Sequence, residues 1–217
     1  LSEVKQEKNF RIDSGYYQKK YLALEKNLNA YGTTTLFELC RQITDFGAFS
    51  QTNFIKFFDE GILFLRNQDV KEGYINLSEN VFITEKIYKR LTLHLQENDI
   101  VIPRVGTLGN AALIEKNMLP CSANQNLAVL RLKNFNPYVI IMVLVSNIGK
   151  AQIFRTSTGN VQQWLNLEAI GNLRIPNFSF HFQQQIEQTV KNFHKKISQA
   201  DEVYKSAEKI LAQALHL

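Results

Sequence analysis

Cysteine and histidine are scarce in this chain, whose 217 residues include two cysteines and four histidines. Cys40 and Cys121 form neither a Cys-x-x-Cys pair nor another metal-ligand spacing, and the histidines are too scattered to complete a zinc site. The sequence therefore predicts reduced thiols in an intracellular, cytoplasmic protein, with no bound metal and no cofactor.

Long apolar runs are absent as well. The longest, from Val139 to Val145, is far shorter than the roughly 20 residues that span a bilayer. The start of the chain is polar where a signal peptide would be apolar. We therefore expect no membrane segment. The first residue is Leu1 rather than Met, which leaves open that the chain is a domain excised from a longer polypeptide.

Patterns typical of catalysis are also missing. The four histidines form no nucleophile or acid–base constellation. The segment 106–109, GTLG, lacks the Gly-Lys-Ser/Thr ending of a phosphate-binding loop and the third glycine of a dinucleotide fingerprint, so it favours a tight turn between two strands. The segment 136–138, NPY, resembles the Asn-Pro-Pro-Tyr motif of amino-methyltransferases but lacks one proline, and a helix start explains it better. The sequence therefore predicts a protein that is not an enzyme and whose polar residues serve recognition.

Three segments are expected along the chain: a helical lead-in over 1–30, a globular domain over 31–180 and a long helix over 181–217. In the lead-in, Ser14 is a candidate N-cap. Tyr17, Tyr21, Leu24 and Leu28 share one face of the helix that it would start.

The middle segment mixes helix and strand. Strands are predicted at 61–66, 99–102, 111–114, 127–132 and 173–175, because each is short, rich in branched or aromatic residues and flanked by turn formers. A helix is predicted from Asn136, as N-cap, to about Ser146, with Gly149 as its stop. The expected fold class is α+β: a mixed α/β globular domain followed by a long C-terminal helix that forms a coiled coil.

That last helix is predicted over about 182–216, directly after a strand that ends at Pro176, and it contains neither glycine nor proline. Apolar residues recur along it at alternating steps of four and three: Ile186, Val190, Phe193, Ile197, Ala200, Tyr204, Ala207, Leu211 and Ala214. Such a stripe is typical of a coiled coil and is too narrow to close a core alone. We therefore expect it to pack against a partner helix.

Several loops concentrate amide, hydroxyl and guanidinium side chains, which can bond base edges in a DNA groove. The same residue types also favour ordinary turns, so no single loop decides between the two readings. The net charge of +5 is compatible with a polyanionic partner. The candidate DNA-contacting residues are Arg66, Asn67, Gln68, Arg104, Thr107, Asn110, Asn124, Gln125, Arg155, Thr156, Ser157, Thr158, Asn160 and Gln162.

The order of these segments resembles the target-recognition domain of type I restriction-modification specificity subunits. Residues 60–70, EGILFLRNQDV, are similar to the family's G-I-P-L-I-R-x-x-D/N-I strand, and 98–109, NDIVIPRVGTLG, to its G-D-I-L-x-x-R-x-G-T-x-G element. Residues 124–131, NQNLAVLR, resemble the strand that follows. Residues 159–175 match the approach to the family's spacer helix, whose entrance I-P-x-P-P-x-x-E-Q-x-x-I is similar to 175–186. The double proline and the glutamate of that entrance are replaced here within 177–184.

The resemblance implies a non-catalytic domain that reads double-stranded DNA and is mounted on a helical spacer. In the family, two such domains and two antiparallel helices lie in one polypeptide, which docks adenine methyltransferase and nuclease subunits and sets the distance between two half-sites. One domain and one helix are present here, so the resemblance implies a half-subunit that forms a homodimer through Ile186, Val190, Phe193, Ile197, Tyr204 and Leu211.

Two alternatives remain open from the sequence. The chain is compatible with the C-terminal recognition region of a single-chain restriction-methylation enzyme, or with a helical protein-interaction module that has no role on DNA.

Overall fold

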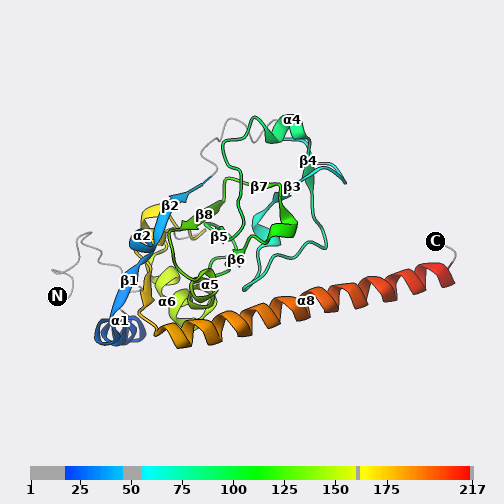
Figure 1. Ribbon diagram of the computed structural model, residues 1–217. Coiled ribbons are helices and arrows are strands. Elements are labelled where there is room, and N and C mark those ends of the chain that lie inside the picture. The colour runs from blue at the N-terminus through cyan, green and yellow to red at the C-terminus, as the bar shows by residue number, and fades with distance from the viewer. Residues whose placement is uncertain (1–17, 46–54, 160–161, 216–217) are drawn as a thin grey trace. The chain divides into compact units, whose positions relative to one another are not determined.

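The protein is described by a computed structural model, in which residues 18–45, 55–159 and 162–215 are described. The chain divides into two compact units, Leu1–Asn177 and Phe178–Leu217. The first unit contains the sheets, and the second consists of one long helix (Figure 1).

Two sheets form the centre of the first unit (Figure 1). The larger has the order β2-β8-β5-β6, with every neighbouring pair antiparallel; its strands are β2 Cys40–Thr44, β8 Leu127–Leu132, β5 Ile100–Pro103 and β6 Ala112–Leu113. The smaller has the order β4-β3-β7; its strands are β4 Phe82–Ile83, β3 Ile62–Leu65 and β7 Cys121–Ala123. Within it, β3 runs antiparallel to β4 and parallel to β7.

One apolar core joins the two sheets. Phe64 and Leu65 of β3 and Val101 of β5 belong to the same cluster of buried side chains, and none of the three is more than 2% exposed. Strands buried to this degree are near-continuous apolar runs, as in the sequence of β8. That pattern is why the predicted strand 127–132 coincides with β8.

The other predicted strands also overlap observed ones, at β3, β5, β6 and β9. The predicted turn at 106–109 is confirmed as a connection between antiparallel β5 and β6. Gly106 and Gly109 take φ angles of +80° and +91°, which side chains disfavour.

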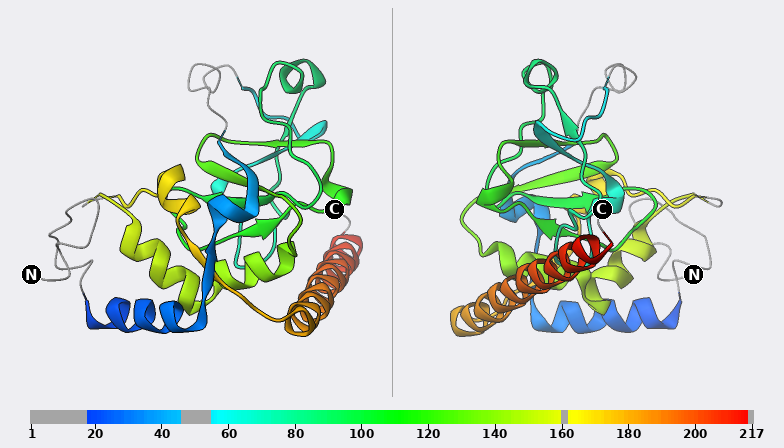
Figure 2. Two further views of the ribbon diagram at one scale, coloured as in Figure 1. Left: turned by 60° about the vertical axis from the view of Figure 1, so that its left-hand side comes forward. Right: turned by 90° about the vertical axis from the view of Figure 1, so that its right-hand side faces the viewer.

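Helices cover the sheets on one side, where α1 Lys19–Tyr31, α5 Pro137–Val145 and α6 Asn147–Thr156 lie together (Figure 2). Three short helices, α2 Leu36–Leu39, α4 Glu85–Tyr88 and α7 Leu167–Gly171, and two 3-10 turns, η2 Asn67–Asp69 and η3 Lys116–Met118, connect the strands. Tyr21 and Leu28 of α1 are buried, as their shared face predicts, whereas Ser14 and Tyr17 lie outside the described residues.

The start of α5 is confirmed, but the prediction of Gly149 as a stop is wrong. Asn136 accepts a hydrogen bond from Tyr138 N at 3.0 Å and Pro137 is the first helical residue. Gly149 lies in the first turn of α6, which begins immediately after α5 with Ser146 as N-cap. A Cβ on Gly149 would lie 2.5 Å from Leu144 O and closer still to Val143 O. Glycine is therefore required for the close approach of the two helices, not to end one of them.

A two-stranded antiparallel ribbon closes the unit. Its strands are β1 Thr33–Thr35 and β9 Arg174–Pro176, with Thr33 opposite Pro176. Asn177 N donates to Gly32 O at 3.1 Å, and Thr34 Oγ1 donates to Asn177 Oδ1 at 2.8 Å. The chain therefore enters and leaves the sheet region side by side.

The second unit contains helix α8, Phe180–Ala214, close to the predicted 182–216. Ser179 caps it by accepting a hydrogen bond from Phe182 N at 3.4 Å. At about 1.5 Å per residue its 35 residues extend about 50 Å. The mixed helix and strand followed by a long helix confirms the predicted fold class; pairing of that helix in a coiled coil stays a prediction.

Among the described residues, no single helix is long and apolar enough to cross a bilayer. Helices α5 and α6 reach that length only together, and they are bent by 68°.

Candidate nucleic-acid interface

Two of the predicted recognition loops lie directly against each other. Asn67, in the turn η2 that follows β3, donates from Nδ2 to Val105 O at 2.9 Å. In return, Asn110 donates from Nδ2 to Val70 O at 2.9 Å. Side-chain amides separated by about 40 residues in sequence therefore lock the loop 105–110 onto the turn after β3.

A third predicted loop, 124–126, adjoins both of these. Asn124 N donates to Leu65 O at 2.9 Å, at the end of β3. Arg104 N donates to Asn126 O at 2.8 Å, at the end of β5. Asn124 also accepts a hydrogen bond from Asn126 N at 3.1 Å, which shapes the loop between β7 and β8.

The last predicted loop, around Thr158, joins the other three through Trp164 and Leu165. Thr158 and Trp164 exchange backbone hydrogen bonds of 2.9 and 2.7 Å, and Leu165 N donates to Arg104 O at 2.8 Å. Four segments far apart in sequence thus meet at one place in the fold. We refer to residues 66–70, 104–110, 124–126, 158–159 and 162–165 as the loop cluster.

Arg66 holds one part of the loop cluster in shape. Its guanidinium bonds the carboxylate of Asp69 through Nε at 3.2 Å and through an Nη atom at 2.9 Å, and it also donates to Glu79 O. Asp69 in turn accepts a hydrogen bond from Arg66 N at 2.7 Å. Arg66, a candidate DNA-contacting residue from the sequence, therefore forms its side-chain bonds with its own turn and with Glu79 O.

Arg104 is engaged even more fully. Its side chain is 9% exposed, pairs with Asp45 at the end of β2, and donates from Nε to Leu165 O at 3.2 Å. Its guanidinium carbon lies 4.3 Å from the centre of the Trp164 ring, a cation–π distance. Arg104 therefore ties three segments together from inside the loop cluster.

Thr156 is predicted as the first residue of a loop that Arg155 adjoins, but both residues lie in the last turn of α6, a helix that the sequence did not predict. Arg155 forms an ion pair with Glu25 of α1 at 2.7 Å, and Thr156 returns a hydrogen bond to Gln152 O at 2.9 Å. Ser157, which caps this helix end, is buried and donates to Phe154 O at 3.0 Å. The loop therefore begins at Ser157, one residue later than predicted, because α6 continues through Thr156.

The remaining candidates differ in how far they face solvent. Gln68, Thr107, Thr158 and Gln162 are exposed, and Asn124 and Gln125 are half-buried. Asn160 lies outside the described residues. The exposed members of the loop cluster therefore carry amides and hydroxyls, while the guanidinium groups of Arg66 and Arg104 are paired with carboxylates of the domain.

Two acceptors in the loop cluster have no hydrogen-bond partner among the described residues: Asn67 Oδ1 and Gln125 Oε1, both buried. An unsatisfied buried acceptor costs about 1–3 kcal/mol unless water or a ligand supplies a donor. Both lie in loops that the sequence assigned to recognition.

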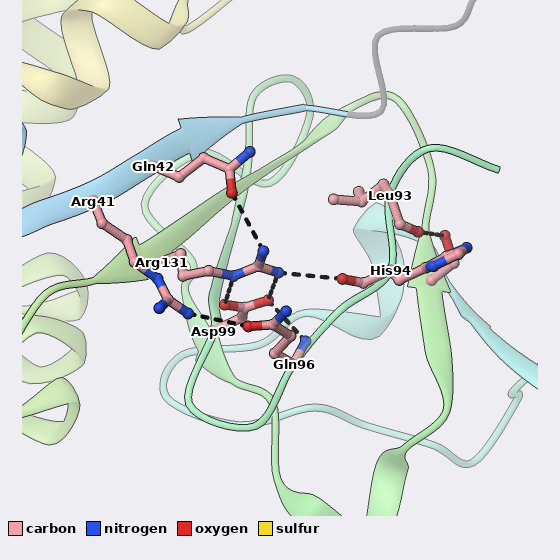
Figure 3. Close-up of polar contacts among 8 residues, drawn as sticks. Arg41, Gln42, Leu93, His94, Gln96, Asp99 and Arg131 are labelled. Carbon is pink, nitrogen blue, oxygen red and sulfur yellow. Dashed lines mark hydrogen bonds and ion pairs between the residues drawn. The ribbon is translucent and has the colours of Figure 1, made fainter.

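A second polar centre, which the sequence analysis missed, lies on the four-stranded sheet (Figure 3). Asp99 is buried and takes two hydrogen bonds from Arg131, at 2.8 Å from Nε and 2.7 Å from an Nη atom. Hydrogen bonding to this carboxylate raises the pKa of Arg131 above its ordinary value. Arg131 also donates to Gln42 Oε1 at 3.3 Å and to His94 O at 3.2 Å. Asp99 and Arg131 both stand in segments that carry the family resemblance, but their pairing across β5 and β8 is invisible to sequence spacing.

Neither cysteine is available for chemistry. Burial raises the pKa of Cys40 and of Cys121 to about 12, so both thiols stay protonated at neutral pH. Among the described residues no group of histidine, cysteine, aspartate and glutamate side chains could hold a metal ion.

No family model and no curated protein matches the sequence. Solved structures do match its fold. A protein from a study of complex assembly and conformational transition of the type I R-M system matches with a TM-score of 0.55 and 13% identity, over 98% of this chain and 53% of that one. The S subunit of a type I restriction-modification system from M. genitalium matches with a TM-score of 0.58 and 16% identity, over 82% of this chain and 42% of that one.

The type IIG restriction endonuclease BpuSI matches with a TM-score of 0.62 and 12% identity, over 87% of this chain and 30% of that one. The chain thus spans about half of the first of these proteins and less of the others. At such identities the likeness concerns the fold alone. This chain has the fold of the specificity subunits of type I restriction-modification systems.

Proposed function

We propose that the chain is a non-catalytic DNA-recognition part of a restriction-modification system, with one target-recognition domain and one spacer helix. The observation that supports this most directly is the loop cluster. Four loops rich in amides and hydroxyls meet at one place, in a fold shared with specificity subunits. Ordinary turn chemistry would not require the four loops to meet.

In this proposal the loop cluster has two kinds of residue. Exposed side chains, among them Gln68, Thr107, Thr158 and Gln162, contact the DNA. Arg66 and Arg104 hold the loops in the shape that the DNA meets, because carboxylates of the domain bind their guanidinium groups. Arg155, outside the loop cluster, holds the end of α6 against Glu25 of α1. The net charge of +5 favours the approach of a duplex.

Binding to duplex DNA tests the proposal. We expect the chain to retain a subset of sequences from a randomised duplex library, and its affinity to fall as salt rises. On a logarithmic scale the slope should be about −0.9 for each phosphate that the protein neutralises. Weak binding that is indifferent to salt would favour a protein-interaction module instead.

Helix α8 is proposed to pair with α8 of a second copy. Tyr204 and Leu211 of the predicted seam are 65% and 61% exposed, and Val203 and Ile210 beside it are 70% and 65% exposed. The C-terminal half of the helix therefore presents a wide apolar stripe. On other positions of the helix, Lys191 pairs with Glu187 and Lys205 with Asp201, at 2.6 and 2.7 Å. An apolar stripe beside a charged face is typical of a helix that buries one side against another helix. A two-fold dimer would then read a symmetric interrupted site.

The mass in solution tests the pairing. Light scattering at high micromolar concentration should give about twice the chain's 25.0 kDa. Leu211→Lys should shift the protein to monomer, whereas Gln213→Lys adds the same charge off the seam and should leave the dimer intact. A monomeric wild-type chain would contradict the homodimer.

Adenine methyltransferase and nuclease subunits are the partners proposed for this assembly. Co-purification of the wild-type chain with a methyltransferase subunit encoded beside it would support this, and a separate elution of the two would count against it.

A second candidate function rests on the likeness to BpuSI, with the highest TM-score of the three structures compared. In that case the chain is the recognition region of a single-chain restriction-methylation enzyme. A reading frame that continues upstream of Leu1 into a methyltransferase would favour this candidate, whereas a start codon directly before it would exclude it.

A further inference from the structure

A polar groove borders the loop cluster on the side of β2. It measures about 340 Å³ and is lined by Gln42, Thr44, Asp45, Thr92, Leu93, His94 and Arg131. The volume is at the lower end of the range of ligand-binding sites. Its lining offers both donors and acceptors, which suits the edge of a nucleobase better than a bare anion. None of these residues was a candidate from the sequence.

Asp45 connects the groove to the loop cluster. It lines the groove and pairs with Arg104, whose Nε donates to Leu165 O. A duplex bound along the loop cluster would therefore have the groove beside it.

An irregularity in β2 directs Gln42 toward this groove. The register of β2 on β8 shifts between Cys40, which lies opposite Leu132, and Gln42, which lies opposite Arg131. The intervening Arg41 is an extra residue on β2, as in a β-bulge. Bulges re-aim side chains and are frequent beside functional sites.

The bulge brings the side chains of two successive residues to the same polar centre. Arg41 donates to Gln96 Oε1 at 3.1 Å, and Gln42 accepts from Arg131 at 3.3 Å (Figure 3). In a regular strand, successive side chains would point to opposite faces of the sheet.

The amide of Gln42 is held in one orientation by a chain of contacts. Buried Asp99 fixes the guanidinium of Arg131 through two hydrogen bonds of 2.8 and 2.7 Å. Arg131 has only donors, so it binds the oxygen of the Gln42 amide and not the nitrogen. The oxygen keeps a second lone pair, and the nitrogen has no partner among the described residues. Gln42 is also exposed.

An amide held in this way presents one acceptor and one donor side by side. Adenine offers the complementary pair in the major groove, the N6 amino group as donor and N7 as acceptor. Guanine offers two acceptors at this edge, cytosine a single donor, and thymine a single acceptor beside its methyl group. Both groups of the fixed amide therefore find a partner on adenine and on none of the other three bases.

We propose that Gln42 reads an adenine of the target through its side-chain amide, and that Arg131 and Asp99 are positioning residues that hold this amide. This inference rests on the proposed DNA-recognition function and names one residue that sets its specificity. It gives the polar centre on the sheet a role distinct from that of the arginines in the loop cluster.

Selection from a randomised duplex library, with wild-type protein and variants in parallel, tests the inference. Gln42→Ala should lower the discrimination at a single A·T position by about 5- to 150-fold, the range of one bidentate base contact. Gln42→Glu keeps an acceptor for Arg131 and should shift the preference at that position toward cytosine, whose amino group is a donor. Gln96→Ala is the matched control, because it removes a neighbouring exposed amide that does not line the groove, and it should leave the selected site unchanged.

Arg131→Lys tests the positioning role. It should relax the same base position, and combining it with Gln42→Ala should give no further loss there, because the two residues act as one unit. If Arg131→Lys fails to fold in a thermal melt, the two Gln42 variants decide the question. An unchanged site for Gln42→Ala, with a defined site for wild type, overturns the inference and leaves the proposed function standing. If the wild type selects no site, the proposed function itself fails, and this inference fails with it.

Discussion

Replacement of Arg104 by alanine tests whether this arginine stabilises the fold or reads a base. The side chain is 9% exposed and makes three interactions: an ion pair with Asp45, a hydrogen bond to Leu165 O, and a cation–π contact with Trp164. A guanidinium in this setting stabilises the folded loops before any DNA is present. Arg104→Ala should therefore lower stability in the free protein.

The size of that loss follows from the three contacts. The hydrogen bond from a charged donor contributes about 1.5–3 kcal/mol and the cation–π contact about 0.5–2 kcal/mol. The ion pair adds less than about 1 kcal/mol, because the Asp45 side chain is 25% exposed and screened by water. Since the three share one side chain and do not add fully, we expect a total of about 3 kcal/mol. For a protein of this size, that corresponds to a fall in Tm of about 6–12 °C.

Thermal melting followed by circular dichroism measures this change. Arg41→Ala is the matched control, because Arg41 is exposed and its side chain donates to Gln96, and its Tm should stay within about 2 °C of wild type. At a temperature below the melting transitions of both wild type and variant, Arg104→Ala should weaken the binding of all DNA sequences to the same extent. An unchanged Tm together with relaxed selectivity at one base pair would refute this reasoning and make Arg104 a base reader.

Three further predictions concern the domain itself. Gly149→Ala should prevent folding or lower Tm by more than 10 °C in a thermal melt, because the new Cβ meets backbone atoms of α5 that cannot move aside; a melt like that of wild type would show that α5 and α6 can separate. Cys40 and Cys121, whose pKa burial raises to about 12, should resist alkylation at pH 8 in native protein and react in denaturant, as mass spectrometry would record; rapid native labelling would contradict their burial. Glu38 has a pKa below its ordinary 4.5, because its carboxylate accepts hydrogen bonds from the Thr35 backbone and hydroxyl. A carboxylate whose pKa is lower in the folded state stabilises the fold at a pH above its unfolded pKa, and this stabilisation is lost as the pH falls through its folded-state pKa. Glu38→Gln should therefore be less stable than wild type at pH 7, and the difference in stability should vanish below about pH 4.5. A difference that stays constant with pH would contradict this.

Elements with strong local signals were predictable from the sequence. The continuous apolar run of β8, the Asn136-Pro137 start of α5 and the seam of α8 each specify their structure through neighbouring residues alone. Strands β1 and β7 gave no such signal, since Thr33–Thr35 and Cys121–Ala123 are too short to show alternation. They form because a partner strand, distant in sequence, supplies their hydrogen bonds.

The sequence predicted where the candidate site lies better than it predicted what each residue of the site does. The loops around Asn67 and Asn124 were predictable from their amide content and the turn before Asn110 from its glycines, and the three do meet in the fold. The pairing of the arginines with carboxylates was not predictable, because Asp45, which pairs with Arg104, lies 59 residues away in sequence. Gln42 was missed for a similar reason: the bulge that re-aims it depends on the register between β2 and β8.

Because β1 pairs with β9, the sheet region begins and ends at neighbouring points of the fold. Gly32 and Asn177 are joined by a hydrogen bond of 3.1 Å, so everything between them could be replaced by another domain without changing the separation of the two attachment points. A grafted domain would also have to supply a cation opposite Glu25 of α1, or that carboxylate would lose the ion pair it now forms with Arg155. New binding preferences could therefore be acquired by exchange of whole domains, with one ion pair as the compatibility requirement at the joint.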